Sequence, residues 1–135
     1  VHLLRRAADF DVVVAENMFG DILSDMAGEL AGSLGIAPSV NASDHRCMAQ
    51  AAHGSAPDIA GRGLANPIAM MLSAGMLLDW LGTRDGDGQA ADAAVRVEAG
   101  VRAAVRGGVA TRDLGGQAST DAFTAAVVER ITAGV

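Results

Sequence analysis

The segment from residue 53 to residue 67 constrains the fold of this chain more than any other. It reads His-Gly-Ser-Ala-Pro-Asp-Ile-Ala-Gly-Arg-Gly-Leu-Ala-Asn-Pro, and its glycines let backbone N–H groups come close to a bulky polar ligand. Asn66 and Pro67 then begin a helix, because proline is favoured at the first helical position. Local chemistry leaves two interpretations open: a surface connection between two elements, or a cradle for a ligand.

Hydrophobic periodicity predicts four helices in the rest of the chain, at residues 20–31, 67–81, 89–106 and from 119 onward. We expect the second helix to end at Gly82 and a loop to follow over residues 83–88. Two short apolar segments, residues 10–15 and 48–52, predict strands. Residues 32–39 show no helix or strand pattern, and residues 41–46 predict a surface loop. The fold class is therefore α/β, with only part of a sheet present.

Composition excludes several classes of protein. The formal net charge is −6 and the basic residues are scattered, so nucleic-acid binding is not expected. Cys47 is the single cysteine, which allows no internal disulfide and fits the reducing cytoplasm. The longest apolar run, residues 67–78, is too short to cross a membrane, and no signal peptide is visible. We expect a cytoplasmic protein without a membrane partner.

Asp21 and Asp25 lie four residues apart, so both carboxylates project from one face of the first predicted helix. Like charges at this spacing weaken a helix by a few tenths of a kcal/mol, and a bound cation removes the repulsion. Mg²⁺ and Mn²⁺ prefer such oxygen ligands. The alternative interpretation is an ordinary solvated helix face.

Common catalytic motifs are absent. The sequence has no Gly-x-Gly-x-x-Gly fingerprint, Walker loop, zinc-ligand spacing or Gly-x-Ser-x-Gly elbow. A Rossmann-type dinucleotide site and a serine nucleophile are therefore not supported.

Three segments together carry a resemblance: residues 17–25 (NMFGDILSD), residues 53–61 with 65–67 (HGSAPDIAG and ANP), and residues 111–116 (TRDLGG). In this order they resemble the C-terminal part of the isocitrate/isopropylmalate dehydrogenase family, whose members are metal-dependent, NAD(P)-linked β-decarboxylating dehydrogenases. The resemblance implies an isopropylmalate dehydrogenase-like, two-domain, homodimeric fold. Residues 1–32 would end the smaller, dimer-forming domain, and residues 33–135 would form the C-terminal part of the cofactor-binding domain.

The resemblance also assigns roles to residues. Asp21 and Asp25 match the helix aspartates that bind Mg²⁺ or Mn²⁺. Asp58 matches the residue that accepts the adenosine ribose hydroxyls, and its charge favours NAD over NADP. The implied reaction is oxidation of a 2-hydroxy dicarboxylate by NAD followed by decarboxylation. The cofactor-binding residues implied are His53, Gly54, Ser55, Ala56, Pro57, Asp58, Ile59, Ala60, Gly61 and Asn66, with His53 and Asn66 near the adenine.

Two departures from the family pattern limit the expectation. The chain contains no Lys and no Tyr, although the family uses both for proton transfer, so no catalytic residue is assigned and these groups are expected before Val1. Gln50-Ala51-Ala52 stands where many members carry Glu-Pro-Val. We expect a C-terminal fragment that is inactive alone and pairs with a second copy or a complete subunit. A non-catalytic regulatory or structural subunit and a nonfunctional remnant stay open, as do isopropylmalate, isocitrate, homoisocitrate, tartrate and malate as substrates.

Overall fold

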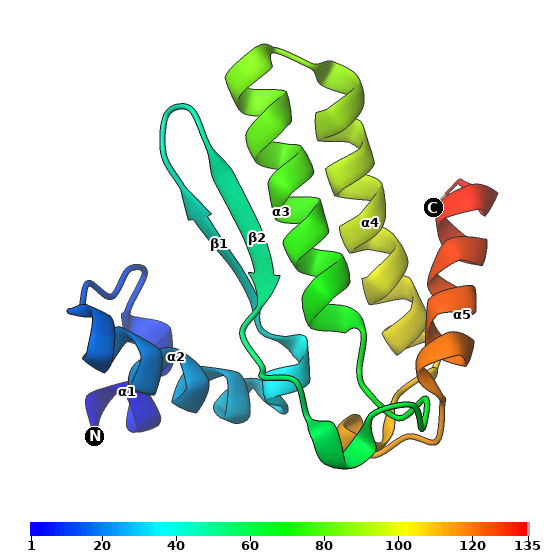
Figure 1. The fold of residues 1–135 in the computed structure, drawn as a ribbon, viewed down its shortest axis with the longest axis horizontal. Helices are drawn as coiled ribbons and strands as arrows, with labels where there is room; N and C mark the ends of the chain where they lie inside the picture. Colours follow the sequence, from blue (N-terminus) through cyan, green and yellow to red (C-terminus); the bar gives the residue numbers. More distant parts are fainter. Residues whose placement is uncertain (135) are drawn as a thin grey trace.

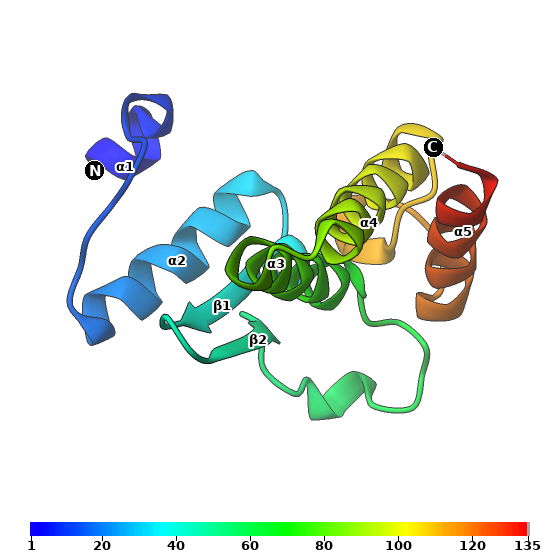
Figure 2. The ribbon, with the colours of Figure 1, turned by 90° about the horizontal axis from the view of Figure 1, so that it is seen from above.

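A hairpin and three helices lie side by side in the computed structural model, which describes residues 1–134 (Figure 1). Seen from above, α1 and α2 lie to one side of the hairpin and α3, while α4 and α5 lie on the other (Figure 2). The helices are α1 His2–Arg5, α2 Asn17–Ala31, α3 Ile68–Asp85, α4 Gly88–Arg106 and α5 Thr120–Ala133, and the strands are β1 Pro38–Ala42 and β2 Cys47–Ala51. Short 3₁₀ turns cover Ala7–Asp9, Leu34–Ile36, Pro57–Ile59 and Arg112–Leu114.

The hairpin pairs β1 with β2 antiparallel, with Pro38 opposite Ala51 and Ala42 opposite Cys47. The prediction of β2 is confirmed, but the expectation that residues 38–42 lie outside a strand is wrong. Pro38 stands at the first position of β1, which is where a strand tolerates proline. The polar sequence of β1 does not indicate a strand by itself, and the strand forms because it pairs with β2.

A buried serine joins the hairpin to α3. Ser73 is fully buried, and its Oγ lies 2.7 Å from the carbonyl oxygen of Gln50 and accepts a hydrogen bond from the Ser39 N–H at 3.2 Å. Because buried polar groups are costly without partners, these bonds fix the hairpin against one face of α3.

Helix α3 runs to Asp85, so the predicted end at Gly82 and the predicted loop over residues 83–88 are wrong. Gly82 instead lets α3 approach α4: a Cβ there would lie 2.9 Å from the backbone nitrogen of Ala91. The helix ends one turn later at Gly86, whose φ is +67°. Gly82 therefore serves helix packing rather than termination.

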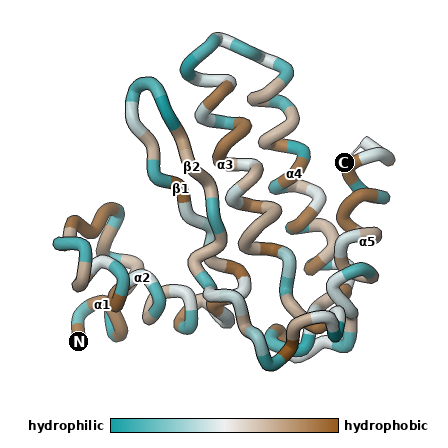
Figure 3. The backbone as a smooth tube through the Cα atoms, in the orientation of Figure 1, coloured by the Kyte–Doolittle hydropathy of each residue, from teal (hydrophilic) through white to brown (hydrophobic). Residues whose placement is uncertain are grey.

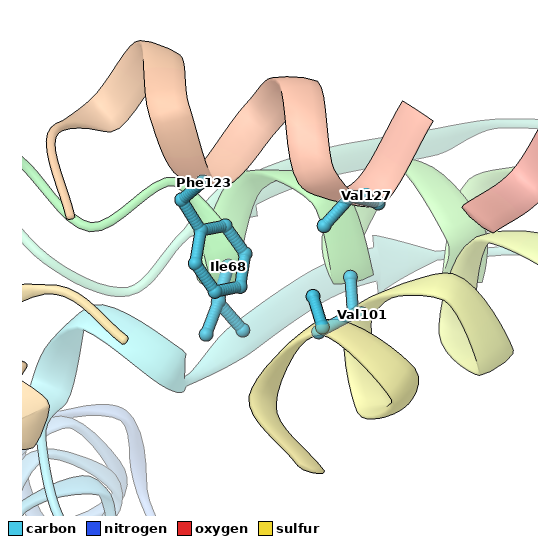
Figure 4. Close-up of a cluster of buried hydrophobic side chains, with 5 residues drawn as sticks. Ile68, Val101, Phe123 and Val127 are labelled. Carbon is cyan, nitrogen blue, oxygen red and sulfur yellow. The ribbon is translucent and has the colours of Figure 1, made fainter. Parts of the chain in front are cut away.

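The hydrophobic core lies where α3, α4 and α5 meet (Figure 4). Phe123 of α5 is fully buried, and Ile68, Val101 and Val127 pack with it. Ser119 caps α5 by accepting a hydrogen bond from the Ala122 N–H. Hydrophobic residues recur along α3 and α5 in the hydropathy colouring (Figure 3). The helices predicted at residues 89–106 and from residue 119 onward are confirmed as α4 and α5.

The predicted buried strand at residues 10–15 is wrong. The segment is not part of a helix or strand, and Val12 and Val14 are 79% and 92% exposed. Its β-branched sequence favours a strand, but no neighbouring strand within residues 1–134 pairs with it. Helix α2 begins at Asn17, three residues before the start that the sequence predicts at residue 20.

Helix α2 packs on the turn Leu34–Ile36 and on α1, and Gly28 is its one buried residue. Its apolar stripe, defined as Met18, Ile22, Met26 and Leu30, is exposed along its whole length. An exposed stripe of this kind is unusual for a monomeric surface.

Candidate functional site

The connection from β2 to α3 forms the floor of the candidate site. Ala56 adopts a left-handed backbone conformation with φ +43° and ψ +62°, which is uncommon for a residue other than glycine. The 3₁₀ turn Pro57–Ile59 follows it, and the Ile59 N–H donates back to the Ala56 carbonyl. Gly61 and Gly63 supply two more left-handed positions. The backbone thus turns at several small residues of this connection, as its glycine-rich sequence predicts.

This connection encloses a hollow of about 840 Å³, which we call the loop hollow. The size falls within the range of small-molecule sites. Its other walls come from the Ser33–Gly35 turn and from Arg112 and Asp113. Of the predicted cofactor residues, His53, Gly54, Ser55, Ala56, Ile59, Ala60, Gly61 and Asn66 line the loop hollow. Pro57 and Asp58 do not line it, and Asp58 is exposed.

Three consecutive backbone donors of this connection lack a hydrogen-bond partner among the described residues. The N–H groups of Gly54, Ser55 and Ala56 make no hydrogen bond to another residue within the described part of the chain. A Cβ built at Gly54, Gly61 or Gly63 would meet nothing within 4 Å. Free N–H groups in an open, glycine-rich turn are a common arrangement for binding phosphate.

His53 has a defined ring orientation. Its Nδ1 lies 2.9 Å from the Gly54 carbonyl oxygen, and because a carbonyl only accepts, Nδ1 carries the proton of this bond. The other ring nitrogen, Nε2, is left for a ligand group. Arg62 and Arg112 also line the loop hollow, so two guanidinium groups border it, which suits an anionic ligand.

Asp113 accepts hydrogen bonds from three side chains. Ser33 Oγ and Asn66 Nδ2 donate to its Oδ2 at 2.5 and 2.8 Å, and Thr111 Oγ1 donates to its Oδ1 at 2.6 Å. Partial burial by itself raises the pKa of the Asp113 carboxyl, but these hydrogen bonds outweigh the burial and hold the pKa below its ordinary value. The carboxylate is therefore ionised at neutral pH.

Asp21 and Asp25 occupy one exposed face of α2, away from the residues that line the loop hollow. Asp25 borders a shallow depression with Leu4, Met26, Glu29 and Leu30. Among residues 1–134 no three His, Cys, Asp or Glu side chains come together as a metal cluster. The part of the chain that the structure describes thus offers the two carboxylates that the sequence predicts, without a third acidic side chain grouped with both of them.

A second hollow, of about 480 Å³, lies between α3 and α4. We call it the α3/α4 groove. Its lining is mainly apolar, including Leu72, Met76 and Val101, with Asp79 and Arg102 at its edge. It contains no residue that the sequence analysis assigns to a ligand.

Comparison with known proteins places this geometry in context. The family model described as isocitrate/isopropylmalate dehydrogenase matches residues 1–131. This chain belongs to the isocitrate/isopropylmalate dehydrogenase family. The sequence-based assignment to this family and to its fold is confirmed.

Relatives in the dehydrogenase family agree in sequence and structure. The isocitrate/homoisocitrate dehydrogenase of Thermus thermophilus is 50% identical over 131 residues, which cover 97% of this chain and 37% of that protein. The 3-isopropylmalate dehydrogenase of Streptococcus pneumoniae is 45% identical, covering 96% and 36%. The crystal structure of isocitrate dehydrogenase from Methylococcus capsulatus superposes with a TM-score of 0.86 at 39% identity, covering 96% of this chain and 37% of that one. The chain thus spans little more than a third of the length of these dehydrogenases.

Sequence reasoning found the loop but missed two of its walls. Ser33 and Asp113 are 80 positions apart, and no local pattern links them. The Thr111–Gly116 segment is part of the family resemblance, but its contact with Asn66 depends on the tertiary fold.

No helix in the described residues of this family member is long and apolar enough to span a bilayer.

Proposed function

We propose that this chain supplies the NAD-holding part of a β-decarboxylating dehydrogenase that acts on a 2-hydroxy dicarboxylate with Mg²⁺ or Mn²⁺. The observation that carries the proposal is the loop hollow, with its free backbone N–H groups and cationic border. Family membership supports oxidative decarboxylation as the reaction type. The proteins named for isocitrate, homoisocitrate and 3-isopropylmalate leave the diacid open.

In this proposal the N–H groups of Gly54, Ser55 and Ala56 donate to phosphate oxygens of the dinucleotide. Asp58 stands outside the loop hollow, where its carboxylate can accept hydrogen bonds from ribose hydroxyls that extend past the rim. The same charge repels the additional phosphate of NADP. His53 Nε2 and the Asn66 side chain contact the base. NAD held by these residues would supply the hydride acceptor for oxidation of the substrate alcohol.

Asp21 and Asp25 are proposed to hold the divalent cation through one carboxylate oxygen each. Two carboxylates on adjacent helical turns suit a hard cation that keeps water or substrate oxygens in its other positions. The cation, when bound, acts as a Lewis acid toward the substrate oxygens. The absence of Lys and Tyr from the chain means that the proton-transfer groups come from elsewhere in the assembled enzyme.

The exposed stripe of α2 supports a partner for this helix, either a second copy or a complete subunit. In keeping with this, residues 1–32 are proposed to belong to the smaller, dimer-forming domain and residues 33–135 to the cofactor domain. Gly32, whose φ is +130°, ends α2 at this proposed boundary.

Calorimetric titration of the chain with NAD and with NADP tests the nucleotide assignment. We expect saturable binding of NAD and weaker binding of NADP. Asp58→Ala should weaken NAD binding and reduce the preference for NAD. Asp44→Ala, which removes an exposed carboxylate from the hairpin turn, is the matched control and should bind as the wild type does. Wild-type chain that binds neither dinucleotide would rule the proposal out.

A non-catalytic nucleotide-binding subunit is the second candidate, favoured by the same lack of Lys and Tyr. The two candidates differ in turnover once the chain is assembled with a complete family subunit. In the dehydrogenase proposal, Asp21→Asn lowers NADH production by the mixed enzyme. In the subunit proposal, NADH production is unaffected by that substitution.

A further inference from the structure

Two segments that lie far from Asp113 in the sequence converge on one of its carboxylate oxygens. Ser33 follows directly after the end of α2, and Asn66 closes the loop before α3. Both donate to Asp113 Oδ2, while Thr111, which is fully buried, donates to Oδ1. Asp113 itself lies in the 3₁₀ turn before α5. The carboxylate is the one group that joins these segments at this point.

The two side chains that donate to Asp113 Oδ2 each accept a hydrogen bond from a backbone N–H group as well. Asn66 Oδ1 accepts a hydrogen bond from the Ile68 N–H at 3.0 Å, so the amide that donates to Asp113 also caps the start of α3. Ser33 Oγ accepts from the Gly35 N–H at 2.9 Å, so the hydroxyl that donates to Asp113 also closes the Leu34–Ile36 turn. The orientation of both side chains is therefore set at their Asp113 end.

The cluster is tightly packed around Gly35. A Cβ at this position would lie 2.9 Å from both Asn66 Cβ and Asp113 Oδ2, and 3.1 Å from Ser33 Oγ. The two 2.9 Å distances are shorter than real Cβ contacts and the third is tighter than most, so a side chain at this position would force the cluster to shift. Ser33, Gly35, Asn66 and Asp113 all line the loop hollow.

We propose that Asp113 is a positioning residue of the loop hollow: it holds the Asn66 amide and the Ser33–Gly35 turn in the orientation that forms one wall. The proposal rests on the proposed function only in naming NAD as the occupant. The positioning of the wall by Asp113 does not depend on which ligand binds. Because Ser33 follows α2, the same carboxylate ties the helix of Asp21 and Asp25 to the hollow.

Chemistry distinguishes this role from that of a ligand-contacting carboxylate. Both side chains that donate to Oδ2 also accept a hydrogen bond from a backbone N–H group, Ser33 from Gly35 and Asn66 from Ile68. Asparagine at position 113 can keep them, since its carbonyl oxygen accepts from Ser33 and Asn66 while its NH₂ donates to Thr111 Oγ1, whose hydroxyl can accept. Alanine at position 113 keeps none of them.

Amide hydrogen exchange measured by NMR tests the positioning role without any nucleotide. Asp113→Ala should accelerate exchange at Gly35 and Ile68 by about tenfold or more, equivalent to about 1.4 kcal/mol, and Asp113→Asn should restore part of the protection. The matched control is Asp87→Ala. Asp87 accepts bonds from the Gln89 and Ala90 N–H groups at the start of α4, so this variant should accelerate exchange at those two amides and leave Gly35 and Ile68 unchanged.

Calorimetry with NAD supplies the second readout. Asp113→Ala should bind NAD about tenfold more weakly, Asp113→Asn should lie between Asp113→Ala and wild type, and Asp87→Ala should match wild type. Should Asp113→Ala not fold, Asp113→Asn takes its place, and exchange at Gly35 and Ile68 in that variant should be faster than in wild type.

Unchanged exchange at Gly35 and Ile68 in folded Asp113→Ala would overturn the proposal. So would a uniform acceleration of all amides, which indicates loss of global stability only. NAD affinity that stays at the wild-type value despite faster exchange would also overturn it. Failure of the wild type to bind NAD contradicts the proposed function, while the exchange result still decides the role of Asp113.

Discussion

At the scale of single residues, the decisive feature is how few side chains carry the site. The loop hollow relies on backbone donors at Gly54, Ser55 and Ala56, and its wall relies on Asp113. The sequence indicates the first group because glycine and small residues in a row predict an open backbone. It does not indicate the second, because the partners of Asp113 come from positions 33 and 66 and become neighbours only in the folded chain.

Asp113 also gives stability a defined pH dependence. Its pKa is lower in the folded chain than in the unfolded chain, so its contribution is full above the ordinary carboxyl pKa of about 4 and is lost as pH falls through the folded-state value. Urea unfolding across acidic pH should show a steeper loss of stability in wild type than in Asp113→Asn. Asp44→Asn should follow wild type. Parallel curves for wild type and Asp113→Asn would contradict the assignment.

At the scale of elements, the helices and β2 were predictable because their hydrophobic patterns reflect contacts within the chain. The β-branched segment at residues 10–15 was not, because a strand needs a neighbour as well as a propensity. Gly82 misled for a similar reason: as a local signal it ends a helix, but the packing of α4 against α3 decides its role. Errors thus concentrate where an element depends on a distant partner.

The junction of α3, α4 and α5 should depend strongly on Phe123. Phe123→Ala removes a fully buried ring and should lower the free energy of unfolding by about 3–5 kcal/mol, measured by urea denaturation. Val128→Ala on the same helix, at a half-exposed position, should change it by less than about 0.5 kcal/mol. Similar losses for both variants would contradict the assigned core.

Helix α2 should respond to a divalent cation. Mn²⁺ that binds only the folded chain raises the melting temperature, and we expect this rise in wild type and its loss in Asp25→Asn. Without Mn²⁺, Asp25→Asn should be more stable by a few tenths of a kcal/mol, because one carboxylate of the repelling pair is gone. Glu29→Gln, one turn further along α2, is the control and should keep the response to Mn²⁺. Equal loss in both variants would assign the effect to the acidic helix in general.

At the scale of the whole molecule, the chain combines a packed helical unit with surfaces that lack a cover. The core of α3, α4 and α5 is complete in itself, whereas the α2 stripe and residues 12–14 are exposed. The relatives are nearly three times as long as the matched region, and we propose that other parts of the assembled enzyme cover these surfaces.

The α2 stripe should therefore drive association. Sedimentation velocity of the wild type should show a concentration-dependent shift from monomer to dimer, because removing the stripe from water is favourable. Ile22→Asp should shift the chain toward monomer. Met70→Asp, on a comparably exposed methionine of α3, should behave as wild type does. Wild-type chain that stays monomeric at every concentration would contradict this prediction.

The central claim is that the loop hollow binds NAD, and backbone NMR during a NAD titration tests it most directly. The account predicts saturating shifts at the amides of Gly54, Ser55, Ala56 and Gly61, with the α3/α4 groove unaffected. Shifts confined to the groove residues Leu72, Met76 and Val101, or no saturating shifts at all, would contradict it.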